Sequence, residues 1–132
     1  MKNILLIDDD LNHLVVLAFA LDEAGYNVIL KMDAESALAV LRENVSLDLI
    51  IIDDQMPGLD ALSFMIMLRE LMPKVPVIVL ARQCNMDTYL KVMSFGAFEY
   101  LNKPVRACEL TRIVIMALDR RLDHDHVSMH ER

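Results

Sequence analysis

The chain has 132 residues, of which 55% are hydrophobic and 25% charged, a composition that fits one globular domain and excludes a disordered chain. Thirteen Lys and Arg against 20 Asp and Glu give a net charge of −7, which disfavours nucleic acid or an anionic membrane as a direct partner. No apolar run has the length of a signal peptide or membrane span, and Cys84 and Cys108 lack metal-ligand spacing. We therefore expect a cytoplasmic domain with reduced cysteines, a disulfide between them being the less favoured alternative.

The first half of the chain alternates strand and helix signals. Asn3–Ile7 is an apolar run of strand length, and a helical stretch from about Asn12 to Ala24 follows it and stops at Gly25. Asn27–Leu30 predicts the second strand. Asp33 is the expected N-cap of the next helix, whose apolar positions recur with the spacing of one buried face.

The second half continues this alternation. Leu49–Ile52 predicts a strand buried on both faces, because its aliphatic run is short and is soon followed by a turn signal. A helix over about Ala61 to Met72 comes next, and then a strand over Val77–Leu80. A helix over about Asp87 to Phe95 and a strand over Tyr100–Asn102 complete the pattern before the last helix.

The last helix begins at about Glu109 and is more apolar than one buried face requires. Its expected core stripe is Leu110, Ile113, Val114 and Ala117. Three further apolar residues are expected on a second, outward face: Ile115, Met116 and Leu118. A brief heptad run continues this face through Leu122 to Met129, and Asp125 interrupts it. We therefore expect this helix to contact a second copy of the chain or an output domain.

Five strands alternating with five helices predict an α/β fold with a doubly wound parallel sheet covered on both faces. We expect one domain over residues 1–120. Residues 121–132 would extend the last helix or begin a linker or tail.

Charged residues follow three of the predicted strands: Asp8, Asp9 and Asp10, then Asp53 and Asp54, then Lys103. Because parallel strands end at the same edge of a sheet, these side chains are expected to meet in one cleft. Asp10 is best explained as a helix N-cap. Two facing acidic loops repel each other unless a cation compensates, and carboxylate oxygens suit Mg²⁺. The sequence therefore predicts a functional Mg²⁺-binding cleft, with ordinary helix caps as the alternative.

Four motifs occur in a specific order: ILLIDDD, DLIIIDDQMPGLDAL, PVIVL and GAFEYLNKP. By these motifs, residues 1–120 resemble the receiver domain of bacterial two-component response regulators. The resemblance implies a flavodoxin-like fold with strand order 2-1-3-4-5. It also implies a signalling domain, not an enzyme with a separate substrate, that takes a phosphoryl group from a sensor histidine kinase and switches a protein–protein interaction.

The resemblance also implies which aspartate accepts the phosphoryl group. The family's acceptor stands three residues before the Met of its M-P-G turn, and Met56 therefore selects Asp53. The implied mechanism is nucleophilic attack by the Asp53 carboxylate on a phosphohistidine. In a strand, successive side chains face opposite sides, so only one of Asp53 and Asp54 is expected to point into the cleft.

The same resemblance implies the remaining members of the site. Asp8 and Asp9 would bind Mg²⁺, with Asp9 and Asp53 as direct ligands and the backbone carbonyl of Gln55 as another. Lys103 would pair with Asp53 and later with a phosphoryl oxygen. The peptide bond from Lys103 to the following proline would be cis.

Two residues depart from the family's pattern at the end of the fourth predicted strand. Ala81 stands where the family has Thr or Ser, so the phosphorylated state would lose a charge-assisted hydrogen bond, typically about 1.5–3 kcal/mol. Arg82 follows it, either as an exposed loop residue or as a cation that reaches the carboxylates or the phosphoryl group. Tyr100 matches the family's switch tyrosine, although aromatic residues are common in strands for other reasons.

Two alternatives to a phosphorylated receiver remain. One is an atypical receiver that acts as an interaction or dimerisation module without phosphorylation, as Ala81 and Arg82 suggest. The other is a phosphatase with an aspartate nucleophile, which requires a second aspartate two residues later. Gln55 occupies that position and argues against a phosphatase.

Overall fold

The structure is a computed structural model that describes residues 1–43 and 45–122, with side chains described as far as residue 119. Residues of the expected tail, with the heptad positions Asp125 and Met129, lie outside the described part, and so does the side chain of Leu122. The strands are β1 Asn3–Ile7, β2 Asn27–Lys31, β3 Leu49–Asp53, β4 Gln55–Met56, β5 Leu59–Asp60, β6 Val77–Ala81 and β7 Glu99–Asn102. The helices are α1 Leu11–Glu23, α2 Ala34–Arg42, α3 Ala61–Leu71, α4 Met86–Ser94 and α5 Ala107–Leu122.

Five of the strands form one parallel sheet in the order β2-β1-β3-β6-β7. Counted among the parallel strands alone, this is the predicted order 2-1-3-4-5, which is confirmed. The strands β4 and β5 form a separate antiparallel pair that the sequence did not predict. They flank a turn in which Gly58 has a φ of +87°, a conformation that favours glycine.

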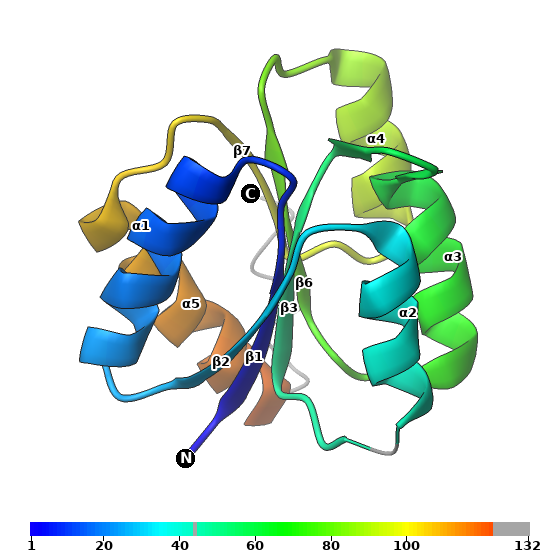
Figure 1. The fold of residues 1–132 in the computed structure, drawn as a ribbon. Helices are drawn as coiled ribbons and strands as arrows, with labels where there is room; N and C mark the ends of the chain where they lie inside the picture. The colour runs from blue at the N-terminus through cyan, green and yellow to red at the C-terminus, as the bar shows by residue number, and fades with distance from the viewer. Residues whose placement is uncertain (44, 123–132) are drawn as a thin grey trace.

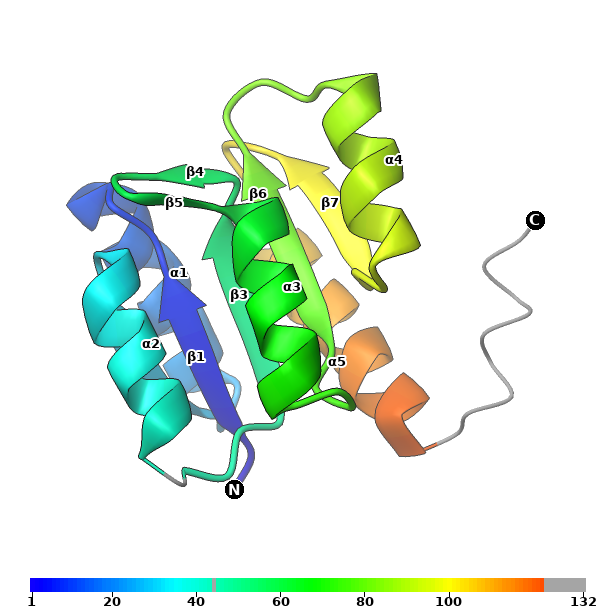
Figure 2. The same ribbon diagram turned by 90° about the vertical axis from the view of Figure 1, so that its right-hand side faces the viewer.

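Helices cover both faces of the sheet (Figure 1). The helices α1 and α5 lie on one face, and α2, α3 and α4 lie on the other, as the view turned by 90° also shows (Figure 2). Alternate residues of each strand face opposite sides: Leu5 and Ile7 join one apolar core, whereas Ile4 and Leu6 join the other. This alternation explains why the central strands are continuously apolar.

The helix starts follow the predicted capping chemistry. The Asp10 carboxylate accepts hydrogen bonds from the backbone N–H groups of Asn12 and His13, and the Asp33 carboxylate accepts one from Ser36. Predicted and observed boundaries agree within about two residues throughout. Both cysteines are free and exposed, and no helix among the described residues is long and apolar enough to cross a bilayer.

The expected outward face of α5 needs one correction. Leu118 is only 8% exposed and belongs to the core between α5 and the sheet, so its predicted position on an outward face is wrong. It lies eight residues after Leu110 and therefore extends the same buried stripe. Ile115 and Met116 are exposed, at 52% and 47% of their surface.

Candidate functional site

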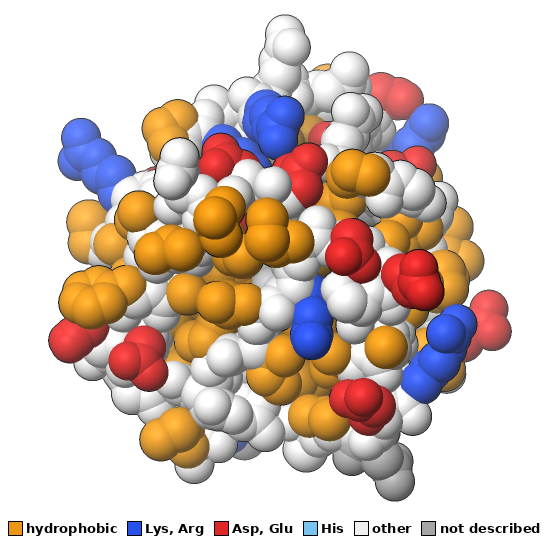
Figure 3. Space-filling view, viewed as in Figure 1, with side chains coloured by type: hydrophobic (Ala, Val, Ile, Leu, Met, Phe, Trp, Pro, Cys, Tyr) orange, Lys and Arg blue, Asp and Glu red, His pale blue; other side chains and the backbone are white. Residues whose placement is uncertain are grey.

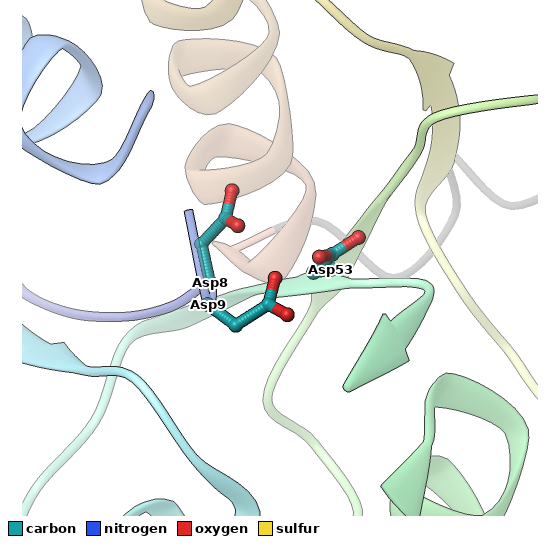
Figure 4. A group of neighbouring side chains, drawn as sticks. All are labelled: Asp8, Asp9 and Asp53. Carbon is teal, nitrogen blue, oxygen red and sulfur yellow. The ribbon is translucent and has the colours of Figure 1, made fainter. Parts of the chain in front are cut away.

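Three carboxylates meet where β1 and β3 end (Figure 4). Asp8 and Asp9 follow β1, Asp53 is the last residue of β3, and carboxylate oxygens of all three lie within 4.8 Å of one another. Asp8 is fully buried and Asp53 is 2% exposed. The predicted convergence of the two acidic loops is therefore present. Asp54 follows the end of β3, is half-buried and also lines the cleft, so the expectation that only one of the pair points there is wrong; it does not join this group.

Two cationic side chains and a histidine lie against this carboxylate cluster. Lys103 Nζ lies 2.9 Å from Asp8 Oδ2 and 3.3 Å from Asp53 Oδ2. The contact with Asp8 Oδ1 at 3.0 Å has hydrogen-bond geometry, whereas Asp53 Oδ2 is buried and accepts no hydrogen bond from the described part of the chain. The Lys103–Pro104 peptide bond is cis, as the resemblance implied. In this state Lys103 therefore binds Asp8 more closely than Asp53.

Arg82 resolves one alternative that the sequence left open. Its Nη2 lies 3.0 Å from Asp9 Oδ1 while the side chain remains 65% exposed. Arg82 is therefore an exposed loop residue and also a partner of the carboxylate cluster. Ala81, at the end of β6, is fully buried and offers no hydroxyl beside Asp53.

The environment separates the acidities of Asp53 and Asp8. Burial raises the pKa of Asp53 to about 6, despite the opposing effect of Lys103 and with a further contribution from the Asp8 charge. Burial also favours the neutral form of Asp8, but hydrogen bonds from His13, from the Asp10 backbone and from Lys103 outweigh it and lower the Asp8 pKa. Burial, and then the charge of Asp60, raises the pKa of Asp54.

A cleft of ≈ 420 Å³ opens beside Asp53. Mostly polar residues line it: Asp53, Asp54, Gln55, Arg82, Gln83, Cys84, Asn85 and Thr88. The cleft lies between the residues that follow β3 and the loop after β6, with Asp53 in its lining. Its volume lies within the range of small-ligand sites.

Tyr100 of β7 lies beneath the loop that joins β6 to α4. The side chain is buried, and its hydroxyl oxygen accepts a hydrogen bond of 3.3 Å from the Asn85 backbone N–H. Its ring meets the edge of Tyr89 with centroids 5.9 Å apart. Burial raises the pKa of the Tyr100 hydroxyl. Tyr100 thus contacts a segment that lines the cleft, a contact that its place in a strand does not by itself explain.

His13 belongs to this site, and sequence reasoning missed it. Its Nδ1 lies 2.8 Å from Asp8 Oδ2, its side chain is 12% exposed, and its Nε2 is buried without a hydrogen-bond partner among the described residues. The available signal was its place in the first turn of the helix that directly follows the acidic loop. A lone histidine beside an apolar helix face is too common for that signal to decide the matter.

The donor set fits a hard divalent cation such as Mg²⁺. All three side chains offer carboxylate oxygens, and one buried Asp53 oxygen, which accepts no hydrogen bond from the described residues, is a candidate ligand. Gln55, in β4, lines the same cleft as Asp53, and the expectation that its backbone carbonyl binds the cation stays a prediction. Magnesium retains several waters, so a few protein oxygens suffice.

Comparison with known proteins identifies the same family. The sequence model of the response regulator receiver domain matches residues 4–115. The transcriptional regulatory protein ZraR of Escherichia coli is 32% identical over 124 residues, covering 94% of this chain and 27% of ZraR. The chain thus spans about a quarter of the length of this curated relative.

Solved structures agree in fold. A receiver domain protein from Clostridium thermocellum superposes with a TM-score of 0.85 at 32% identity, covering 92% of this chain and 97% of that one. The beryllofluoride-activated receiver domain dimer of NtrC4 gives a TM-score of 0.87 at 27% identity, with 92% and 99% covered. Together with the matched motifs and the acidic cleft, these similarities show that the chain belongs to the response regulator receiver domain family.

Proposed function

We propose that this receiver domain accepts a phosphoryl group on Asp53 from a phosphohistidine of a sensor kinase, in the presence of Mg²⁺. One observation carries the proposal: the buried Asp53 carboxylate faces Asp8, Asp9 and Lys103, and one of its oxygens accepts no hydrogen bond from the described part of the chain. The cleft beside it supplies the approach.

The chemical step follows from these groups. An Asp53 oxygen attacks phosphorus, the bond between phosphorus and the imidazole nitrogen breaks, and an acyl phosphate forms while the imidazole takes up a proton. With a pKa of about 6, Asp53 is mostly ionised at pH 7 and able to attack. Lys103, 3.3 Å from Asp53 Oδ2, is close enough to contact a transferred phosphoryl oxygen. Mg²⁺, when bound, would neutralise negative charge on the oxygens of the transferred phosphoryl group.

A kinase that donates to Asp53 must contact the surface around the cleft. The helix α1 begins directly after the acidic loop and exposes Leu11, Val15 and Phe19, by 55%, 53% and 69%. Figure 3 shows hydrophobic side chains gathered on the side where Figure 1 places α1. We propose that the kinase contacts this apolar stripe when it donates the phosphoryl group, and that this contact takes place in the cytoplasm.

The output of the domain is a protein–protein contact, for which α5 is the proposed surface. Ile115 and Met116 remain exposed on that helix. A homodimer through α5, or contact with an output domain after a receiver of residues 1–120, would cover them. The beryllofluoride-activated receiver domain of NtrC4 is a dimer, and the greater length of ZraR leaves room for further domains.

A second function is favoured by a specific observation. Ala81 offers no hydroxyl to a phosphoryl group, and Arg82 already neutralises Asp9. A receiver with these features is suited to an interaction or dimerisation role that does not depend on phosphorylation. The lack of a response to phosphodonor would favour this second function.

Intact-mass analysis tests the main proposal. Wild-type protein is incubated with acetyl phosphate, with Mg²⁺ or with chelator, beside Asp53→Asn and a matched Asp54→Asn control. We expect one added phosphoryl group in the wild type and in Asp54→Asn, only with Mg²⁺. Labelling of Asp53→Asn, or none in the wild type, would contradict the proposal.

A further inference from the structure

We propose that Arg82 is a tethered counter-ion of Asp9 that competes with Mg²⁺ for this carboxylate. The inference deepens the proposed function and rests on its metal site. Arg82 Nη2 lies 3.0 Å from Asp9 Oδ1, and Asp9 is one of the three residues whose carboxylate oxygens lie within 4.8 Å of one another. A guanidinium placed there supplies positive charge at the point where a metal ion would supply it.

The position of Arg82 follows from the backbone around it. The loop after β6 is fixed two and three residues further on, where the Cys84 N–H donates to Asn102 Oδ1 at 3.2 Å and the Asn85 N–H donates to the Tyr100 hydroxyl at 3.3 Å. Both acceptors belong to β7, the strand next to β6 in the sheet. Arg82 is thus held within reach of Asp9 by the same sheet edge that presents the carboxylates.

Charge explains why the pair is favoured without metal. Lys103 contacts Asp8 and Asp53, and His13 contacts Asp8, but the ion pair of Asp9 is made with Arg82. Direct ligation by Asp9 would place a divalent charge on the carboxylate that Arg82 now contacts, so the metal ion and the guanidinium compete for the negative charge of Asp9. Loss of the contact between Arg82 and Asp9 therefore makes the free energy of metal binding less favourable.

The exposure of the pair sets the size of the effect. The Arg82 and Asp9 side chains are 65% and 29% exposed, so solvent screens their attraction. Exposed ion pairs of this kind correspond to about a 1.5- to 5-fold change in an equilibrium constant. Arg82 therefore tunes the affinity for Mg²⁺ and does not block the site.

Calorimetric titration of Mg²⁺ at low ionic strength tests the inference with wild type and Arg82→Ala. We expect Arg82→Ala to bind about 1.5- to 5-fold more tightly, with the difference shrinking as monovalent salt is added. Lys31→Ala is the matched control, because Lys31 ends β2 at the same edge and makes no ion pair with the three aspartates in the described structure. It removes one positive charge without removing the contact.

The outcomes separate this inference from the metal site itself. Equal affinities of wild type and Arg82→Ala, or an equal gain in Lys31→Ala, would overturn the role of Arg82 while leaving the site intact. No Mg²⁺ binding by any of the proteins would overturn the site and the inference together. Melting in chelator gives a second measurement, in which Arg82→Ala should be less stable than the wild type because Asp9 has lost its counter-ion.

Discussion

Replacing Asp53 with Asn should stabilise the metal-free fold, because the wild type buries a charge there. Burial raises the pKa of Asp53 to about 6, against an ordinary value near 3.9, and this difference corresponds to roughly 3 kcal/mol at pH 7. An acid whose pKa is raised by folding destabilises the fold once it ionises. The penalty is absent below about pH 4, grows between pH 4 and 6, and is then constant.

Denaturant unfolding in chelator at several pH values measures this effect. At pH 7 we expect Asp53→Asn to unfold with a free energy up to about 3 kcal/mol higher than the wild type, and the two to converge towards pH 4. Millimolar Mg²⁺ should narrow the difference, because only the wild type keeps the full ligand set. The Asp54→Asn control should not respond to Mg²⁺ in this way. A variant no more stable than the wild type at pH 7 would refute the reasoning.

Three further substitutions test other parts of the site. Beryllofluoride and Mg²⁺ should stabilise Ala81→Ser against thermal unfolding more than they stabilise the wild type, by about 1.5–3 kcal/mol, because serine restores a hydroxyl beside the phosphoryl position. An equal stabilisation of both proteins would argue against a role for this hydroxyl. His13→Leu should lower the free energy of unfolding by about 1.5–3 kcal/mol at pH 7 and His13→Asn by less, because the buried Asp8 carboxylate loses a charge-assisted hydrogen bond. Folding lowers the Asp8 pKa, so this loss should fade as pH falls below about 4, and a loss independent of pH would point to packing instead. Sedimentation should show a dimer for the wild type and a monomer for Ile115→Glu, and a wild-type monomer would end the proposed α5 interface.

The sheet and its acidic edge were predictable from short-range patterns. Runs such as Leu49–Ile52 can be buried on both faces only within a covered sheet, and parallel topology then brings Asp8, Asp9 and Asp53 to one edge. The pair β4 and β5 was missed because strands of two residues carry no periodic signal.

Contacts between distant residues were not predictable in the same way. The sequence left Arg82 with two roles because its partner, Asp9, is 73 residues away and depends on the course of a loop. His13 was missed for a different reason: its partner Asp8 is only five residues away, but a lone histidine in the first turn of a helix is too common to predict such a contact. Leu118 was placed on the wrong face because the buried stripe of α5 is one position longer than assumed.

Direct identification of the modified residue tests the central claim most sharply. After reaction with acetyl phosphate and Mg²⁺, borohydride reduces an aspartyl phosphate to homoserine, and peptide mass mapping then locates the altered position. We predict conversion at Asp53 in the wild type and in Asp54→Asn, and no conversion anywhere in Asp53→Asn. Conversion at Asp8, Asp9 or Asp54, or an unmodified Asp53 in protein that binds Mg²⁺, would contradict the assignment of Asp53 as the phosphoryl acceptor.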